Sequence, residues 1–124
     1  DMLAVARLGS GRFHYELTAV DLAEVVRTVA ADDLWMSPSY KSACVGLHFT
    51  WVGDWDAVRE RLPLIEERLR PFEPRPHWGK LFIMSPDEVQ SRFPRIQDFR
   101  ECMQRYDPSG KFRNDFLDTY IYPR

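Results

Sequence analysis

Hydrophobic residues alternate with small or polar residues between Cys44 and Val52, which is the pattern of a β-strand with one buried face. Side chains two positions apart on a strand share a face, so one face of this strand would join the core. That face carries Val45, Leu47, Phe49 and Trp51, and the opposite face carries Cys44, Gly46, His48 and Thr50. Because His48 and Thr50 point the same way, both can bind one ligand; an ordinary exposed sheet face is the alternative.

Hydrophobic residues recur at helical spacing after Asp54, which is a good N-cap. The pattern predicts a helix of about four turns. Its apolar face would carry Trp55, Val58, Leu62, Ile65 and Leu69. Charged residues occupy most of the opposite side, and we expect Glu66 and Glu67 there to be solvated. Pro63 lies inside the helix and can kink it, and the prolines between positions 71 and 76 end it and start an extended linker.

Two shorter helices are predicted nearer the C-terminus. Ser85 and Glu88 form a capping box, with Pro86 at the first helical position. Pro94 opens the second helix, and its core face would carry Ile96, Phe99, Met103 and Tyr106. Residues 107–110 are expected to form a turn, and residues 111–124 to pack as an irregular tail.

The N-terminal part of the chain carries weaker patterns. Residues 1–12 are expected to form a loose segment, followed by a short strand over Phe13–Thr18. Residues 21–31 fit either a helix or a β-branched strand, and we favour a strand from about Glu24. Residues 32–42 should form a loop. This order of elements lacks regular βαβ alternation and predicts an α+β fold, an antiparallel sheet with helices packed on one face.

The composition is that of a single soluble globular domain, with 124 residues, 44% hydrophobic and 29% charged. A net charge of −2 provides no basic surface for nucleic acid, and no apolar run is long enough to span a membrane. Cys44 and Cys102 are too few for a disulfide scaffold, which favours a reducing, cytoplasmic location. We divide the chain into a poorly assigned segment, residues 1–23, and a domain of residues 24–124.

A second candidate for chemistry is the run from His77 to Lys80. Gly79 permits a close backbone approach or an unusual φ, so Lys80 would project a cation from a constrained turn and could stabilise a developing anion. A surface lysine after a turn is the alternative, and His77 beside Trp78 is typical of a packed histidine. The histidines lack zinc-ligand spacing, and no phosphate-binding glycine loop or G-x-S-x-G motif occurs. No metal site is therefore expected.

Four stretches of the chain resemble the C-terminal part of alditol (xylitol) oxidases. They are residues 27–35 (RTVAADDLW), 48–51 (HFTW), 75–80 (RPHWGK) and 107–117 (DPSGKFRNDFL). The His-Trp-Gly-Lys block and the Asp-Pro…Gly-x-Phe-x-Asn ending are fairly specific to the sugar-acid and alditol branch. These oxidases belong to the vanillyl-alcohol-oxidase group of flavoproteins, together with the aldonolactone oxidases.

The resemblance implies that FAD is held by an N-terminal domain and covered by a cap domain, an antiparallel sheet with outer helices. In such enzymes a primary alcohol of an alditol such as xylitol or sorbitol gives a hydride to the flavin, and O2 reoxidises the flavin with release of H2O2. Carried over by position, Lys80 would be the catalytic cation beside the flavin, and His48 would also line the cofactor. Substrate hydroxyls would be bound by Arg27, His48, Thr50 and Lys80.

The chain departs from this family pattern in two ways. The family has a glutamate two residues before the arginine, whereas Val25 stands there and Glu24 lies one residue away. Either a β-bulge restores the carboxylate to the face of Arg27 or that carboxylate is missing. We also expect the flavin-binding domain to be absent from this chain. The chain alone would then be inactive and would need a flavin-binding domain or subunit as its partner.

Other functions stay open. The chain could be a stand-alone binding or self-assembly module, in which exposed apolar surface would favour a homodimer. It could also be a small sugar-binding protein, or part of an aldonolactone oxidase or dehydrogenase. Size-exclusion chromatography with light scattering separates the self-assembly module from the cap, because only the module needs a second copy.

Overall fold

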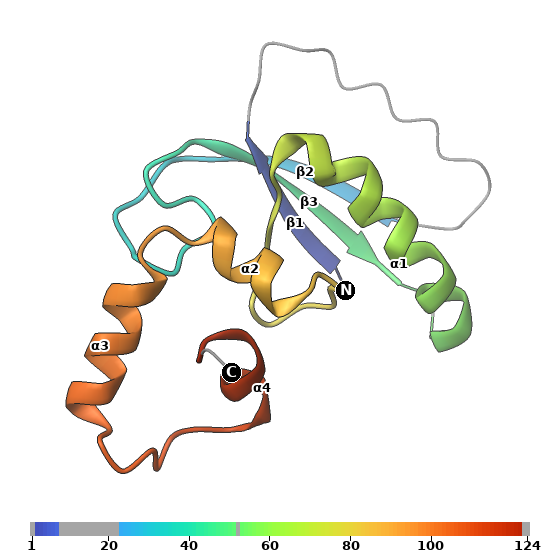
Figure 1. The fold of residues 1–124 in the computed structure, drawn as a ribbon. Helices are drawn as coiled ribbons and strands as arrows, with labels where there is room; N and C mark the ends of the chain where they lie inside the picture. Colours follow the sequence, from blue (N-terminus) through green and yellow to red (C-terminus); the bar gives the residue numbers. More distant parts are fainter. Residues whose placement is uncertain (1, 8–22, 52, 123–124) are drawn as a thin grey trace.

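The structure, a computed structural model, describes residues 2–7, 23–51 and 53–122. Figure 1 shows a sheet with one long helix lying across it; of the remaining helices, the gold one lies beside the sheet and the orange and dark red ones lie below it. The combination of antiparallel strands and helices confirms the predicted α+β class. The strand predicted over Phe13–Thr18 lies outside the described residues.

Four strands form one antiparallel sheet in the order β2-β3-β1-β4. They are β1 (Met2–Arg7), β2 (Ala23–Val29), β3 (Cys44–Thr50) and β4 (Arg75–Pro76). The strand β2 confirms the preference for a strand from Glu24. The prediction that residues 1–12 are loose is wrong for Met2–Arg7, because this segment pairs with β3 along its whole length and with β4 at Ala4 and Val5.

Helix α1 (Trp55–Leu69) covers one face of the sheet and is followed by a short 3₁₀ helix, η1 (Arg70–Phe72). Side chains of α1 and β3 form a buried group that we call the sheet cluster: Leu47, Phe49, Leu62, Ile65 and Leu69. Val45 and Trp51 pack against this cluster, which confirms the predicted core face of β3. Asp54 caps α1 as predicted, since its side chain accepts a 3.1 Å hydrogen bond from the N–H of Ala57.

One charged side chain of α1 is buried, contrary to the expectation that it is solvated. Glu66 is 8% exposed, and its carboxylate accepts a 2.5 Å hydrogen bond from the N–H of Ile83. Desolvation raises the pKa of this carboxyl above its ordinary value. Its neighbour Glu67 is exposed, as predicted. The helix runs unbroken through Pro63, and Trp55, predicted on the apolar face, is exposed.

The second core is built around three helices: α2 (Pro86–Arg92), α3 (Ile96–Tyr106) and α4 (Asp115–Tyr120). Its buried members, which we call the helical cluster, are Met84, Val89, Phe93, Ile96 and Ile121. Ser85 caps α2 by accepting from the N–H of Glu88, as the capping box predicted. Phe99 and Met103 pack against the cluster as expected, whereas Tyr106, at the end of α3, is 76% exposed.

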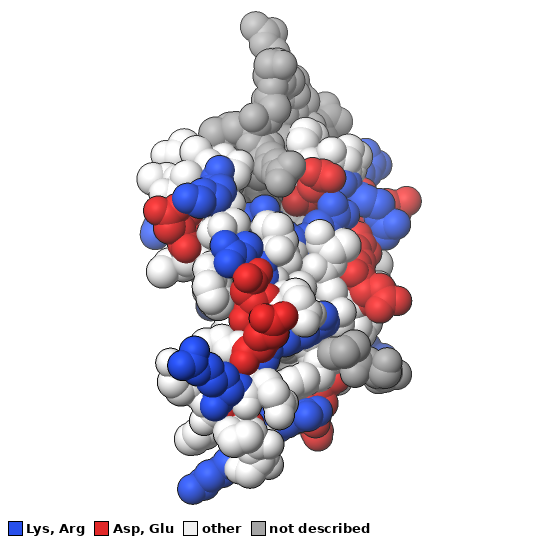
Figure 2. Space-filling model, turned by 60° about the vertical axis from the view of Figure 1, so that its left-hand side comes forward, with Lys and Arg blue, Asp and Glu red and all other residues white. Residues whose placement is uncertain are grey.

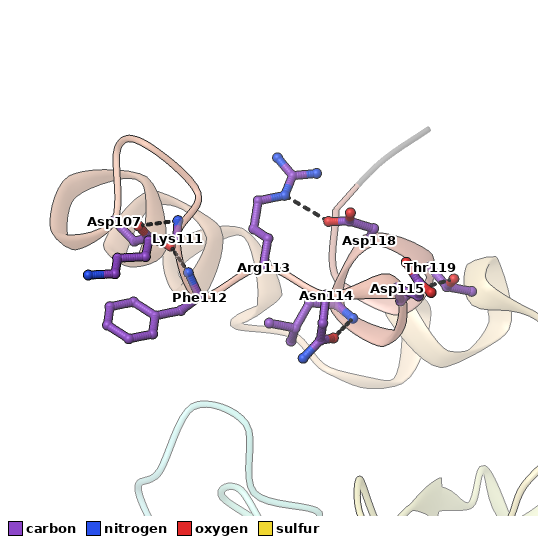
Figure 3. Close-up of polar contacts among 9 residues, drawn as sticks. Asp107, Lys111, Phe112, Arg113, Asn114, Asp115, Asp118 and Thr119 are labelled. Carbon is purple, nitrogen blue, oxygen red and sulfur yellow. Dashed lines mark hydrogen bonds and ion pairs between the residues drawn. The ribbon is translucent and has the colours of Figure 1, made fainter.

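The last part of the described chain contains a helix, whereas residues 111–124 were predicted to be irregular. Asn114 starts α4 by accepting a 2.9 Å hydrogen bond from the N–H of Leu117 (Figure 3). Just before it, the carboxylate of Asp107 accepts from the N–H groups of Lys111 and Phe112, at 2.7 and 2.8 Å. Asp107, in the predicted turn, and Asn114, in the predicted tail, therefore both accept hydrogen bonds from backbone N–H groups.

Acidic and basic side chains are interspersed over the face of the molecule that Figure 2 shows. The chain has 17 basic and 19 acidic residues, and no large area of one sign stands out on that face. None of the helices in the described part of the chain is both long and apolar enough to cross a membrane.

Candidate functional site

Arg27, His48 and Thr50 occupy one face of the sheet, opposite the face that α1 covers. In the antiparallel pairing of β2 with β3, Arg27 lies opposite Gly46 and Val25 lies opposite His48. Residues paired across antiparallel strands point to the same side of the sheet, so Arg27 shares the face of His48 and Thr50. Arg27 and Thr50 are exposed and His48 is half-buried. The face predicted from alternation in β3 thus extends to β2.

The pairing of β2 with β3 contains no bulge. Each residue from Ala23 to Val29 has one partner in β3, and Glu24 pairs with Phe49. The position of Glu24 therefore alternates with that of Arg27 and does not share its side of the sheet. Of the two alternatives for the family glutamate, the register supports a missing carboxylate, with Val25 at its position.

Lys80 ends a turn that directly follows β4. Its N–H donates to the carbonyl of His77 at 3.0 Å, and the N–H of Gly79 donates to His77 Nδ1 at 3.0 Å. The expectation that Gly79 has an unusual φ or permits an exceptionally close approach is wrong. Its φ is not positive, and a Cβ there would lie 3.5 Å from His77 Cε1, an ordinary contact. The turn is held by the ring and carbonyl of His77.

The sheet register also places the Lys80 turn relative to the polar face. Ala4 pairs with Leu47 on one side and with Pro76 on the other, so β3 and β4 run parallel to each other with β1 between them. Two strand spacings separate them, roughly 10 Å. The chain therefore leaves β4 toward the end of the sheet at which Thr50 lies. That the four predicted side chains meet at one ligand stays a prediction.

Arg75, the first residue of the stretch 75–80, is buried beside the Lys80 turn. It is 6% exposed, and its guanidinium donates to the carbonyls of Pro38 and Tyr40 at 3.1 and 3.2 Å. A signal for it exists in the sequence, because Arg75 stands between Pro74 and Pro76. The following proline restricts the backbone of Arg75 to extended conformations, which limits the direction in which its side chain leaves the chain.

Both cysteines are free thiols. Cys44 is buried, and desolvation raises the pKa of its thiol, so the thiol stays protonated. It packs as a small hydrophobic side chain. Among the described residues, no group of three or more His, Cys, Asp or Glu side chains is placed to hold a metal ion.

The fold and the site define an α+β domain that presents a polar sheet face and carries a lysine on the turn after its edge strand. The chain belongs to the D-arabinono-1,4-lactone oxidase family, whose model matches residues 22–120. The match confirms the resemblance found in the sequence. Members of this group are flavin-linked alditol and aldonolactone oxidases.

Individual relatives point to the same group. The chain is 51% identical to the alditol oxidase of Streptomyces sp. over 92 residues, which are 74% of this chain and 22% of that protein. It is 45% identical over 52 residues to the long-chain alcohol oxidase of an uncultured marine euryarchaeote, covering 42% of this chain and 11% of that protein. It is 28% identical over 100 residues to the L-gulonolactone oxidase of Scyliorhinus torazame, covering 78% of this chain and 23% of that protein. The chain thus spans less than a quarter of the length of these curated relatives.

Proposed function

We propose that residues 24–124 form the cap of an FAD-dependent oxidase that converts the primary alcohol of alditols such as xylitol and sorbitol to the aldehyde. The alcohol loses a hydride from carbon and a proton from oxygen, and O2 takes up the two electrons and two protons as H2O2. The observation that carries this proposal is the shared sheet face of Arg27, His48 and Thr50, in a chain 51% identical over 92 residues to an alditol oxidase.

In this proposal the polar sheet face binds the polyol. Arg27 donates hydrogen bonds to hydroxyl oxygens, and His48 and Thr50 can each donate and accept. Lys80 would supply a positive charge beside the flavin, where it would stabilise the negative charge that the flavin gains when it accepts the hydride. A valine at position 25 offers no hydrogen bond where the family pattern has a glutamate, so we expect one hydroxyl to be held more weakly.

FAD would supply the hydride acceptor of such an oxidase. The resemblance to alditol oxidases implies that Lys80 and His48 face it. Lys80 lies on a hydrogen-bonded turn and His48 is half-buried. The described residues contain no unit of strand, glycine loop and helix N-terminus that would hold the ADP part. We therefore expect a flavin-binding domain or subunit to complete the site.

Two free thiols fit a reducing compartment such as the cytoplasm.

A chimera tests the proposal. The 92-residue matching stretch of this chain would replace its counterpart in the Streptomyces alditol oxidase, and H2O2 release with xylitol would be measured. We expect an active chimera and no activity from the isolated chain with added FAD. Lys80→Met should lower kcat/KM by about 100-fold or more. The matched control Lys111→Met, at an exposed lysine, should leave it unchanged. An inactive chimera that retains flavin, or equal activities of the two variants, would overturn the proposal.

A lactone is the alternative substrate class. The L-gulono-1,4-lactone dehydrogenase of Mycobacterium tuberculosis is 27% identical over 100 residues, which are 79% of this chain. The chimera separates the two classes when kcat/KM is compared for xylitol and for L-gulono-1,4-lactone, with the parent oxidase as the reference. A ratio of kcat/KM for the lactone to that for xylitol that is higher in the chimera than in the parent oxidase would indicate that the substrate is a lactone.

A further inference from the structure

The loop between β2 and β3 is shaped by one carboxylate. Asp32 Oδ2 accepts hydrogen bonds from the hydroxyls of Ser37 and Ser39, at 2.5 and 2.8 Å, and its Oδ1 accepts from the N–H of Leu34 at 3.0 Å. The backbone of Asp32 closes the loop, since its N–H donates to Ser39 and its carbonyl accepts from the N–H of Lys41. A single side chain therefore organises residues 32–41.

The closed loop directs three alternate carbonyl groups toward the segment that precedes Lys80. The carbonyls of Pro38 and Tyr40 accept from the guanidinium of Arg75. The carbonyl of Met36 accepts a 2.9 Å hydrogen bond from Trp78 Nε1. These bonds join parts of the chain 35 to 42 positions apart.

The two donors lie close to Lys80 in the chain, on its N-terminal side. Arg75 belongs to β4, where its pairing with Val5 places it in the sheet. Trp78 lies inside the turn whose ends are joined by the hydrogen bond from the N–H of Lys80 to the carbonyl of His77. Because both donors are anchored in the same loop, a change in the shape of the loop shifts the backbone that carries Lys80.

We propose that the loop of residues 32–41 positions Lys80, and that Asp32 is a positioning residue that acts through Arg75 and Trp78. The catalytic meaning of this inference rests on the proposed function, in which Lys80 supplies a positive charge beside the flavin. A preorganised charge is effective only where it is held, and a displacement of about 1 Å can cost about 100-fold in rate.

The charge state of Asp32 fits this role. Hydrogen bonds from the hydroxyls of Ser37 and Ser39 hold the pKa of its carboxyl below the ordinary value. The carboxylate therefore stays ionised at neutral pH and accepts from all three donors. A matched control stands next to it, since Asp33 is exposed and makes an ion pair with the exposed Lys41.

The first test measures the position of Lys80 in the chain itself, without activity. Amide hydrogen exchange at Lys80, and the NMR signals of its side-chain methylene groups, would be compared in Asp32→Ala and Asp33→Ala. We expect Asp32→Ala to speed exchange at the Lys80 amide by about tenfold, the effect of losing about one net hydrogen bond, and to shift the side-chain signals. Asp33→Ala should change neither.

A second pair of variants keeps the inference testable if Asp32→Ala does not fold. Trp78→Phe removes the N–H that binds Met36 but keeps a ring against Phe93, whose centroid lies 4.4 Å away. Trp55→Phe, at an exposed tryptophan, is its control. We expect Trp78→Phe to alter the Lys80 signals and Trp55→Phe to leave them unchanged. Identical Lys80 exchange and signals in the Asp32 or Trp78 variant and in its control would overturn the inference.

The chimera then separates this inference from the proposed function. We expect Asp32→Ala to lower kcat by about tenfold or more, with a smaller change in KM, and Asp32→Asn to recover part of the loss because its amide oxygen still accepts. One outcome would support the positioning and contradict the proposed function. In that outcome Asp32→Ala alters the Lys80 signals, but Lys80→Met leaves the activity of the chimera unchanged. A chimera that needs Lys80 but keeps its kcat in Asp32→Ala would contradict the positioning alone.

Discussion

The sheet cluster and the helical cluster are built in different ways. In the sheet cluster, mostly aliphatic side chains of α1 pack on a strand that is held by pairing with distant segments. The helical cluster is assembled from neighbouring helices and is surrounded by aromatic rings. Those rings are Trp78, Phe82, Phe99 and Tyr120. One core therefore depends on strand pairing and the other on packing between helices and on ring contacts.

The difference matters because the segment around Lys80 packs on both cores. Leu81 lies against the sheet cluster, whereas Trp78 and Phe82 lie against the helical cluster. Lys80 thus stands between side chains that pack against different cores. Its position depends on both regions, while the polar face that carries Arg27 belongs to the sheet alone.

The largest expected effect tests the helical cluster. Phe93 is 1% exposed and packs on Trp78, so Phe93→Ala should lower the free energy of unfolding by about 3–5 kcal/mol through lost burial and a cavity. Urea unfolding followed by tryptophan fluorescence measures it. Phe112→Ala, at a ring that is 73% exposed, is the control and should stay within about 0.5 kcal/mol of the parent.

A change in the sheet cluster sharpens the comparison. Leu62→Ala should lower the free energy of unfolding by about 2–5 kcal/mol. It leaves the Phe93 ring, which packs on Trp78, in place. We therefore expect Phe93→Ala to disturb the NMR signals of the Lys80 turn more than Leu62→Ala does. Equal disturbance by the two variants would show that the cores do not act separately on this turn.

A smaller effect is expected at the hydrogen bond that joins α1 to the segment after Lys80. Glu66→Ala removes the acceptor of the Ile83 N–H and should cost about 1–2 kcal/mol. Glu66→Gln keeps an acceptor oxygen without the buried charge and should match or exceed the parent at neutral pH. Glu67→Ala, at the exposed neighbour, should change stability by less than about 0.5 kcal/mol in urea unfolding.

The pH dependence at Glu66 has a definite sign. Folding raises the pKa of its carboxyl above the ordinary 4.5, so the folded protein favours the protonated form. The stability contributed by that protonated form is present below pH 4.5 and is lost as pH rises through the folded-state pKa. The free energy of unfolding of the parent should therefore decrease relative to that of Glu66→Gln as pH rises through this range. A constant difference across it would contradict the buried carboxylate.

The smallest effect is expected at the cap of α4. Asn114→Ala removes the acceptor of the Leu117 N–H and should cost about 1 kcal/mol. Lys111→Ala, whose backbone N–H still reaches Asp107, is the control and should leave the midpoint of urea unfolding unchanged. A loss as large as that of Phe93→Ala would mean that α4 holds the whole helical cluster together.

Local patterns predicted the elements whose signals lie in adjacent residues. The alternation in β3 and the caps at Asp54 and Ser85 were found because each involves neighbours in the chain. The strand β1 was missed because its partners in β3 and β4 lie far along the chain. Helix α4 was missed because aromatic and polar residues alternate in its segment, which suggested irregular structure.

The candidate site was predictable to the same extent. His48 and Thr50 were placed on one face by alternation, but the register of β2 was needed to add Arg27. Arg75 could not be connected with its acceptors because they lie 35 and 37 positions earlier. Glu66 appeared solvated because its partner, the N–H of Ile83, is 17 positions away. Contacts of that length are set by packing and not by local pattern.

A crystal structure of the chimera with bound xylitol tests the central claim most directly. We predict that the side chains of Arg27, His48 and Thr50 and the Nζ of Lys80 all lie within about 3.5 Å of one polyol molecule or of the flavin beside it. A polyol bound elsewhere, with Lys80 directed to solvent and the sheet face unoccupied, would contradict the account.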